Sequence, residues 1–142
     1  MWNLANARTA IAAAREYAAD NGLKPLAVVA VDAGGYVVAT EREDGAANGR
    51  VDIASGKATG ALEFGMGSRS LMTRAEQQAY FVITAGATVR TPVVPVPGGV
   101  LVRDADGALL GALGISGDTS DNDEAAAIHG IMAIGLVPDP GA

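Results

Sequence analysis

Cysteine is absent from this chain of 142 residues, and aromatic residues make up only 4% of it. Without cysteine the protein can form no disulfide, and it has no thiolate for catalysis or metal binding. Because hydrophobic residues still account for 49% of the sequence, the core must be built mainly from Ala, Val, Ile and Leu. Side chains this small allow helices and strands to approach each other closely.

Clusters of basic residues and long apolar runs are also missing. The formal net charge of −6, from 16 acidic and 10 basic residues, disfavours binding to nucleic acid. No apolar run is long enough to span a bilayer, and Arg8 interrupts the first apolar pattern where a signal peptide would lie. We therefore expect a cytoplasmic protein without nucleic-acid or membrane partners. The length favours one domain over residues 1–142.

Hydrophobic periodicity defines the elements of the first half of the chain. The first helix is predicted to begin after Asn3, a suitable N-cap, and to stop at Gly22. A short β-branched run follows, then a turn containing Gly34 and Gly35 and a returning strand, which together predict a β-hairpin. The predicted elements are helix 4–21, strands 26–31 and 36–41, and helix 51–64.

The helix predicted over 51–64 carries Gly56 and Gly60 in its interior, on the same side as Lys57. Each interior glycine costs about 1 kcal/mol relative to alanine. A helix tolerates this cost where another backbone or a ligand must come close. The sequence leaves both possibilities open at this face.

In the second half, residues 66–71 are predicted to be a connection, and Thr73 and Glu76 form a capping box for a helix that reaches about residue 85. Three prolines between 87 and 97 predict an extended loop or edge segment. Asp106-Gly107 is a strong hairpin signal. The remaining predicted elements are strands 100–103 and 108–115, a helix over 121–135 and a loose tail containing Pro138 and Pro140. Hairpins combined with helices predict an α+β domain with an antiparallel sheet.

An ordered set of short motifs runs through the chain. It comprises Val29–Asp32, Gly34-Gly35, Glu41-Arg42-x-Asp44-Gly45-Ala46, Ile53-Ala54-x-x-Lys57-Ala58, Gly98-Gly99, Gly111-x-x-Gly114-Ile115-Ser116-Gly117 and Asp123-Glu124. No motif is specific alone, but together and in this order they resemble the GlcG/HbpS family of haem-degrading-like proteins (DUF336). The resemblance implies a profilin-like fold with a five-stranded antiparallel sheet flanked by helices. It also implies homo-oligomers, from dimers up to octamers, and for some members the binding of haem or a relation to corrinoid adenosyltransferases.

Two basic residues lie on motif positions. Arg42, followed by Asp44, could hold a carboxylate through its planar guanidinium, or the two could pair with each other and order the loop. Lys57 could act as a base, a nucleophile or an anion-holding charge, or it could be an ordinary surface lysine. We assign Arg42 and Asp44 to substrate binding and Lys57 to catalysis.

The glycine-rich stretch around the last predicted strand gives a second group of candidates. Ser116 does not form a G-x-S-x-G nucleophile elbow, because Asp118 occupies the final position. Backbone N–H groups near Ser116 and Gly117 could instead face a ligand. Together with Gly98 and Gly99, these residues are assigned to one wall of a small-molecule site.

The start of the last predicted helix is acidic. Asp121 fits an N-cap with Glu124 at its N3 position, which leaves one carboxylate more than capping requires. We assign Asp123 to substrate binding and Glu124 to general acid–base chemistry. His129, the only histidine, is a departure from the family pattern. It is assigned to catalysis, with a haem or metal ligand and a packing histidine as alternatives.

Two functions are compatible with these candidates. The first is an enzyme of lyase, isomerase or hydrolase type that needs no cofactor and acts on a small anionic or carbonyl-bearing metabolite. The alternative is a haem- or corrinoid-binding carrier or sensor, which requires an axial ligand and an apolar slot. We place the enzyme first and expect no metal site.

Overall fold

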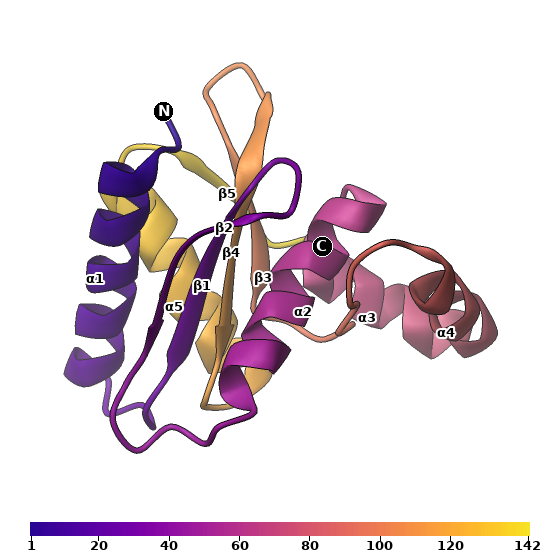
Figure 1. The fold of residues 1–142 in the computed structure, drawn as a ribbon, viewed down its shortest axis with the longest axis horizontal. Helices are drawn as coiled ribbons and strands as arrows, with labels where there is room; N and C mark the ends of the chain where they lie inside the picture. The colour runs from indigo at the N-terminus through magenta and orange to yellow at the C-terminus, as the bar shows by residue number, and fades with distance from the viewer.

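The computed structural model describes residues 1–142 and contains five helices and five strands (Figure 1). Along the chain these are α1 (Leu4–Asp20), β1 (Ala27–Asp32), β2 (Val37–Arg42), α2 (Arg50–Phe64), α3 (Ser68–Gln77), α4 (Ala79–Thr88), β3 (Gly99–Arg103), β4 (Leu109–Ser116), α5 (Ser120–Ala133) and β5 (Val137–Asp139). None of the helices has the length and hydrophobicity needed to cross a bilayer.

The five strands form one sheet in the order β2-β1-β4-β3-β5, and every neighbouring pair is antiparallel. Val29 in β1 lies opposite Thr40 of β2 on one side and Gly114 of β4 on the other. The two predicted hairpins, β1–β2 and β3–β4, are therefore confirmed, as is the α+β class with its five-stranded antiparallel sheet.

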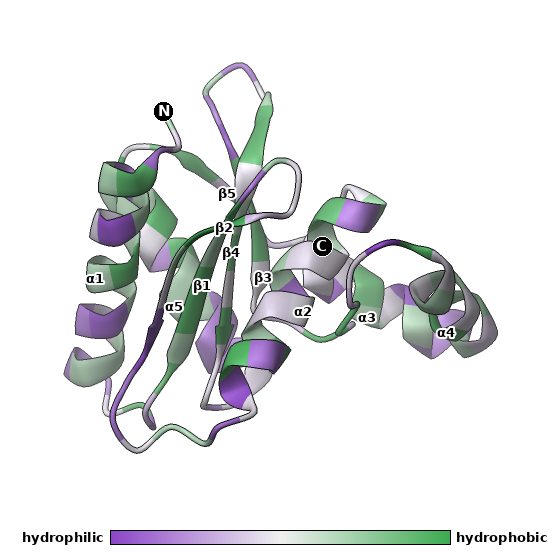
Figure 2. Cartoon of the chain, in the orientation of Figure 1, coloured by the Kyte–Doolittle hydropathy of each residue, from purple (hydrophilic) through white to green (hydrophobic).

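Helices cover the sheet on both faces, with α1 and α5 on one and α2 on the other (Figure 1). Successive side chains of a strand point to opposite faces, so Val28 and Ala30 pack under α1 and α5 while Val29 and Val31 pack under α2. β1 is buried on both sides, which explains its continuous hydrophobic run (Figure 2).

The predicted loose tail is wrong, because the chain end forms an edge strand. β5 pairs with β3, and the Arg103 guanidinium lies 3.0 Å from the Asp139 carboxylate. Beyond β5, the Pro140 carbonyl accepts a hydrogen bond from the backbone N–H of Arg69 at the start of α3. Pro138 is tolerated because β5 is at the edge of the sheet, where one side needs no backbone donor.

Two predicted helix starts are also corrected. Thr73 lies inside α3, which already begins within the predicted connection, and its hydroxyl donates to the carbonyl of Arg69 as in a continuing helix. The backbone leaves the helical region only at Gln78, between α3 and α4. At α5 the N-cap is Thr119, whose side chain accepts from the N–H of Asn122, so Asp121 is within the helix and does not cap it.

The close packing of α2 depends on glycines, both on neighbouring strands and on the surface of α2 itself. A Cβ on Gly114 of β4 would lie 2.0 Å from the Ala54 carbonyl oxygen, and one on Gly60 would lie 3.1 Å from the Cα of Val93. The N–H of Val94 donates to the Gly56 carbonyl. The glycine face of α2 is thus covered by the proline-containing loop of the same chain. Of the two possibilities left open by the sequence, a neighbouring backbone and not a ligand lies against Gly56 and Gly60.

Replacing Gly114 by alanine is expected to destabilise the protein by at least about 2 kcal/mol, because the added methyl group would overlap backbone atoms of α2. The matched control is Gly86→Ala in α4, where a Cβ would make only ordinary contacts of 3.6 Å with Val93. Removing this interior glycine should be neutral or stabilising by up to about 1 kcal/mol. Urea unfolding of both variants measures the difference, and equal stabilities would contradict the packing described here.

Candidate functional site

The most buried ionisable groups of the chain are Lys57 and Asp123, and they form an ion pair. Lys57 Nζ lies 3.1 Å from Asp123 Oδ2 and donates a second hydrogen bond to the Ile115 carbonyl at 3.0 Å. The two side chains are 3% and 1% exposed. The structure therefore brings together two of the predicted site residues that are 66 positions apart in the sequence.

Three elements create this pair. Lys57 extends from the middle of α2 past Gly98, where a Cβ would lie 2.9 Å from Nζ. Gly98 also has a positive φ of 123°, which a residue with a side chain rarely adopts. Asp123 stands in the first turn of α5, and its other oxygen, Oδ1, accepts from the Asp118 N–H at 2.9 Å. Both carboxylate oxygens are therefore satisfied within the chain.

Burial shifts the pKa values of the pair in opposite directions. Loss of solvent lowers the pKa of Lys57 below 10.5, although the Asp123 charge acts against this change and the nearby Arg50 adds to it. Loss of solvent likewise raises the pKa of Asp123 above 3.8, against the attraction of Lys57 and the backbone N–H groups. Desolvation is the larger cause for both groups, so ionising the pair in place is costly.

Two arginines lie around this pair. Arg50, at the start of α2, donates to the hydroxyl of the fully buried Ser116 at 3.1 Å. Arg69, in the first turn of α3, binds both carboxylate oxygens of Glu124 at 3.2 and 3.0 Å and contacts Asp121 at 2.5 Å. The predicted acid–base residue Glu124 is thus held in an ion pair between α3 and α5.

Arg69 was not among the predicted site residues. Its partner Glu124 is 55 positions away. No motif or local charge pattern around Arg69 indicates this contact, and only the docking of α3 beside α5 creates it. Arg50 was not among the predicted site residues either, and its partner Ser116 lies on a strand 66 positions away in the sequence.

The glycines assigned to a ligand wall serve packing in this structure. A Cβ on Gly99 would lie 2.1 Å from the Lys57 carbonyl oxygen, and the Gly99 N–H donates to the buried Ser68 hydroxyl at 2.7 Å. A Cβ on Gly117 would lie 2.2 Å from the Pro25 carbonyl oxygen. Gly98, Gly99 and Gly117 therefore allow neighbouring segments to touch.

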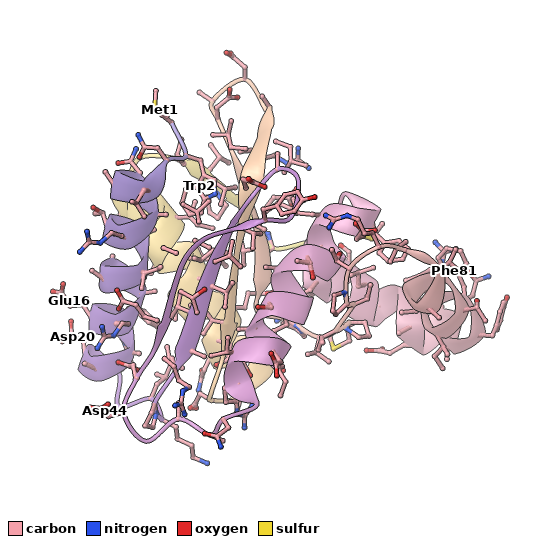
Figure 3. All side chains as sticks on the ribbon, viewed as in Figure 1. Met1, Trp2, Glu16, Asp20, Asp44 and Phe81 are labelled. Carbon is pink, nitrogen blue, oxygen red and sulfur yellow. The ribbon has the colours of Figure 1, made fainter.

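Arg42 and Asp44 lie at the far end of β2 and do not pair with each other. Arg42 donates to the Ala46 carbonyl at 2.9 Å and to Asn48 Oδ1 at 3.1 Å. It therefore orders its own loop, but through these acceptors and not through the Asp44 carboxylate. Asp44 is exposed beside the end of α1 (Figure 3). It borders an open hollow of about 330 Å³ together with Arg15, Ala18, Ala19, Leu23, Pro25 and Glu43.

A second hollow, of about 490 Å³, is lined by residues of α1 and by Glu41. Neither hollow contains Lys57, Asp123, Glu124 or His129. No group of three or more His, Asp or Glu side chains is arranged to hold a metal ion.

His129 is exposed on the outer side of α5, away from the sheet. Its ring lies 5.1 Å from the ring of Tyr17 in α1, tilted by 33°. His129 is on the side of α5 that faces α1. Asp123 is on a different side of the helix and points to Lys57, which also binds the Ile115 carbonyl of β4. The structure therefore divides the candidates between a buried corner, formed by Lys57 and Asp123, and an outer face that carries His129.

These features define a small α+β protein with one antiparallel sheet, helices on both faces and a buried Lys–Asp pair at one corner. The chain matches the family described as "Haem degrading protein HbpS-like" over residues 2–132. It belongs to this HbpS-like family, as its motifs indicated.

Solved structures of similar proteins agree with this assignment. PduOC in complex with haem is 27% identical, with 95% of this chain and 96% of that chain covered and a TM-score of 0.83. A double mutant of HbpS from Streptomyces reticuli is 30% identical over 92% of this chain and 85% of that one, with a TM-score of 0.79. ORFY of Klebsiella pneumoniae shares the fold, at 23% identity, 94% and 90% coverage and a TM-score of 0.84. No curated protein matches the chain by sequence.

Removing one member of the buried pair is expected to destabilise the fold strongly. Lys57→Met should cost about 3–5 kcal/mol, because Asp123 would remain buried without its counter-charge. The double variant K57M/D123L should recover most of this loss or exceed the parent stability, since an apolar pair needs no solvation. Thermal and urea unfolding measure both, and a K57M variant as stable as the parent would contradict the pair's role.

The pair also predicts a pH dependence of stability. Because folding raises the pKa of Asp123, this group stabilises the folded state at pH values below 3.8. That stabilisation is lost as the pH rises through the pKa of Asp123 in the folded protein. Because folding lowers the pKa of Lys57, this group stabilises the folded state at pH values above 10.5. That stabilisation is lost as the pH falls through the pKa of Lys57 in the folded protein.

The free energy of unfolding of the parent minus that of K57M/D123L should therefore pass through a minimum between these two windows. Urea unfolding of both proteins across this pH range measures the difference. A maximum at intermediate pH would show that attraction outweighs desolvation.

Proposed function

We propose that this protein binds haem, with His129 as the axial ligand, and that it does so as a homo-oligomer. The observation that carries the proposal is the position of His129. It is the only imidazole of the chain, it is exposed, and its ring packs against Tyr17. A neutral imidazole with an available ring nitrogen is a common axial ligand of haem iron.

The residues around His129 fit part of what haem requires. Met132, one helical turn away, is 61% exposed, and the Tyr17 ring adds a second apolar surface. Neither hollow of the single chain lies here, so one chain supplies an axial donor and one apolar wall. A macrocycle also needs a second wall. We assign this wall to another copy of the chain, which is why self-association is part of the proposal.

Similarity to known structures supports the same ligand. The haem complex of PduOC is matched over nearly its whole length, and HbpS over most of its own. Both likenesses are above 25% identity, and the family match over residues 2–132 includes His129. The family and the available imidazole therefore indicate the same class of ligand independently.

The enzyme that we placed first gains less support from the geometry. Lys57 and Asp123 are buried and hydrogen-bonded to each other, and Glu124 is bound by Arg69. A substrate could reach Lys57 only after these contacts opened. Acid–base catalysis by Lys57, Glu124 and His129 stays a prediction, as do the single domain over residues 1–142 and the cytoplasmic location.

Haem binding can be measured by titrating the full chain with haemin and following the Soret band. We expect a shifted band and saturation in the micromolar range, because one imidazole and a partial apolar wall give moderate affinity. His129→Ala should weaken binding about tenfold or more and change the band position. Tyr17→Ala should weaken binding with the band position unchanged, since it removes a wall and not the ligand.

Asp20→Ala on the exposed end of α1 is the matched control and should leave the titration unchanged (Figure 3). Absence of a Soret shift in the parent chain would exclude haem binding. If the His129→Ala variant gave a Soret shift of equal size, the protein would still bind haem, but His129 would not be its axial ligand.

A further inference from the structure

We infer that the outward stripe of α4, formed by Tyr80, Ile83, Thr84 and Ala87, pairs antiparallel with the same stripe of a second copy of the chain. The inference rests on the self-association proposed above and names a contact surface for it that is separate from the surface around His129. α3 and α4 extend to one side of the sheet, and Phe81 marks the end of this arm (Figures 1 and 3).

α4 carries no charge on any side and is mostly apolar, which is unusual for an exposed helix. Residues 79–88 contain no charged side chain. The inner side, with Val82 and Gly86, faces its own chain, since Val82 is 5% exposed and Gly86 approaches Val93. The outer side has no such cover. Because a helix with apolar side chains on every side is normally buried, the exposed Ile83 and Tyr80 on the outer side of α4 point to a partner there.

The outer stripe is suited to a dry contact. Tyr80 and Ile83 are 68% and 71% exposed, the largest exposures among the apolar side chains that follow α3. The Thr84 hydroxyl already donates to the Tyr80 carbonyl at 2.6 Å, which leaves its methyl group for packing. If this stripe were covered, the Thr84 hydroxyl would therefore still have a hydrogen-bond partner.

The spacing of large and small residues fits a copy of the same helix. In an antiparallel pair with a twofold axis between positions 83 and 84, Tyr80 lies opposite Ala87 of the second copy, and Ile83 lies opposite Thr84. Each large side chain then meets a smaller one, as packing of ridges into grooves requires. A twofold interface uses the same patch on both copies, so one stripe is sufficient.

Charge disfavours two alternatives to pairing of copies through α4. With a net charge of −6, two copies repel each other, and contact through the acidic start of α5 would increase this repulsion. The α4 stripe carries no charge, so copies can meet there without a like-charge penalty. Helices that bind membrane surfaces carry Lys or Arg along their polar side, and α4 has neither.

Four side chains bury less than the roughly 800 Å² per partner of a standard interface. We therefore expect α4 pairing either to be of micromolar strength alone or to join with another surface in a larger assembly. Sedimentation of the full chain over a range of concentrations should show a dimer or larger species without added haem.

Ile83→Glu should weaken this association about tenfold or more, because it buries a charge at the centre of the stripe. The matched control is Val37→Glu on the edge strand β2, where Val37 is 62% exposed, and it should leave the mass unchanged. A monomeric parent chain would overturn both the self-association and this surface. An oligomer that survives Ile83→Glu intact would overturn this surface alone.

Cross-linking tests the geometry directly, because the chain has no cysteine of its own. Thr84→Cys, beside the twofold axis, should cross-link to itself through a short bismaleimide. Tyr80→Cys should not, since the two copies of position 80 are offset by seven residues, or about 10 Å along the helix. A mixture of Tyr80→Cys and Ala87→Cys should cross-link. Self-linking at 80 with none at 84 would overturn the antiparallel arrangement.

Discussion

The close approach of α2 to the sheet is the constraint on which the rest of the structure depends. The α2 backbone touches β3 and β4 where Gly99 and Gly114 have no side chains. Because α2 lies this close, Lys57 can pass Gly98 and reach the start of α5. A single alanine on either strand would push α2 outward and withdraw Lys57 from Asp123. The glycines therefore determine which charged groups can meet.

The Lys57–Asp123 pair follows from this packing and fixes the corner between α2, β4 and α5. Burial lowers the pKa of Lys57 and raises that of Asp123, against the attraction between the two charges. Such a pair adds little net stability, yet removing one partner leaves a buried charge that has no counter-ion. We therefore expect the pair to favour this arrangement of α2 and α5 over alternatives in which either group would be buried alone. Lys57, a residue of the family motif, thus contributes to the architecture of the fold.

Local patterns in the sequence were sufficient for most elements but not for contacts across the chain. The β-branched run with its Gly34-Gly35 turn, and the Asp106-Gly107 turn, predicted both hairpins correctly. The Thr73–Glu76 pattern failed because α3 starts earlier, where Pro140 of the chain end meets Arg69. Ionic partners 55 and 66 positions apart leave no periodic signal. Lys57 could be singled out from the family motif and its small neighbours, whereas its partner Asp123 was one of several acids at the helix start.

Within one chain, nearly all buried polar groups already have partners, and this bears on where a ligand can bind. Lys57, Asp123 and Ser116 are each hydrogen-bonded inside the chain, and Glu124 is held by Arg69. A new ligand there would have to replace contacts that the fold itself uses. His129 and the outer stripe of α4 are different, because His129 is exposed with only a ring contact to Tyr17, and the α4 stripe is exposed to solvent. They lie on separate elements, so a ligand at one and a second copy at the other can bind without competing, and an assembly can bring a second wall to His129 while the interior stays unchanged.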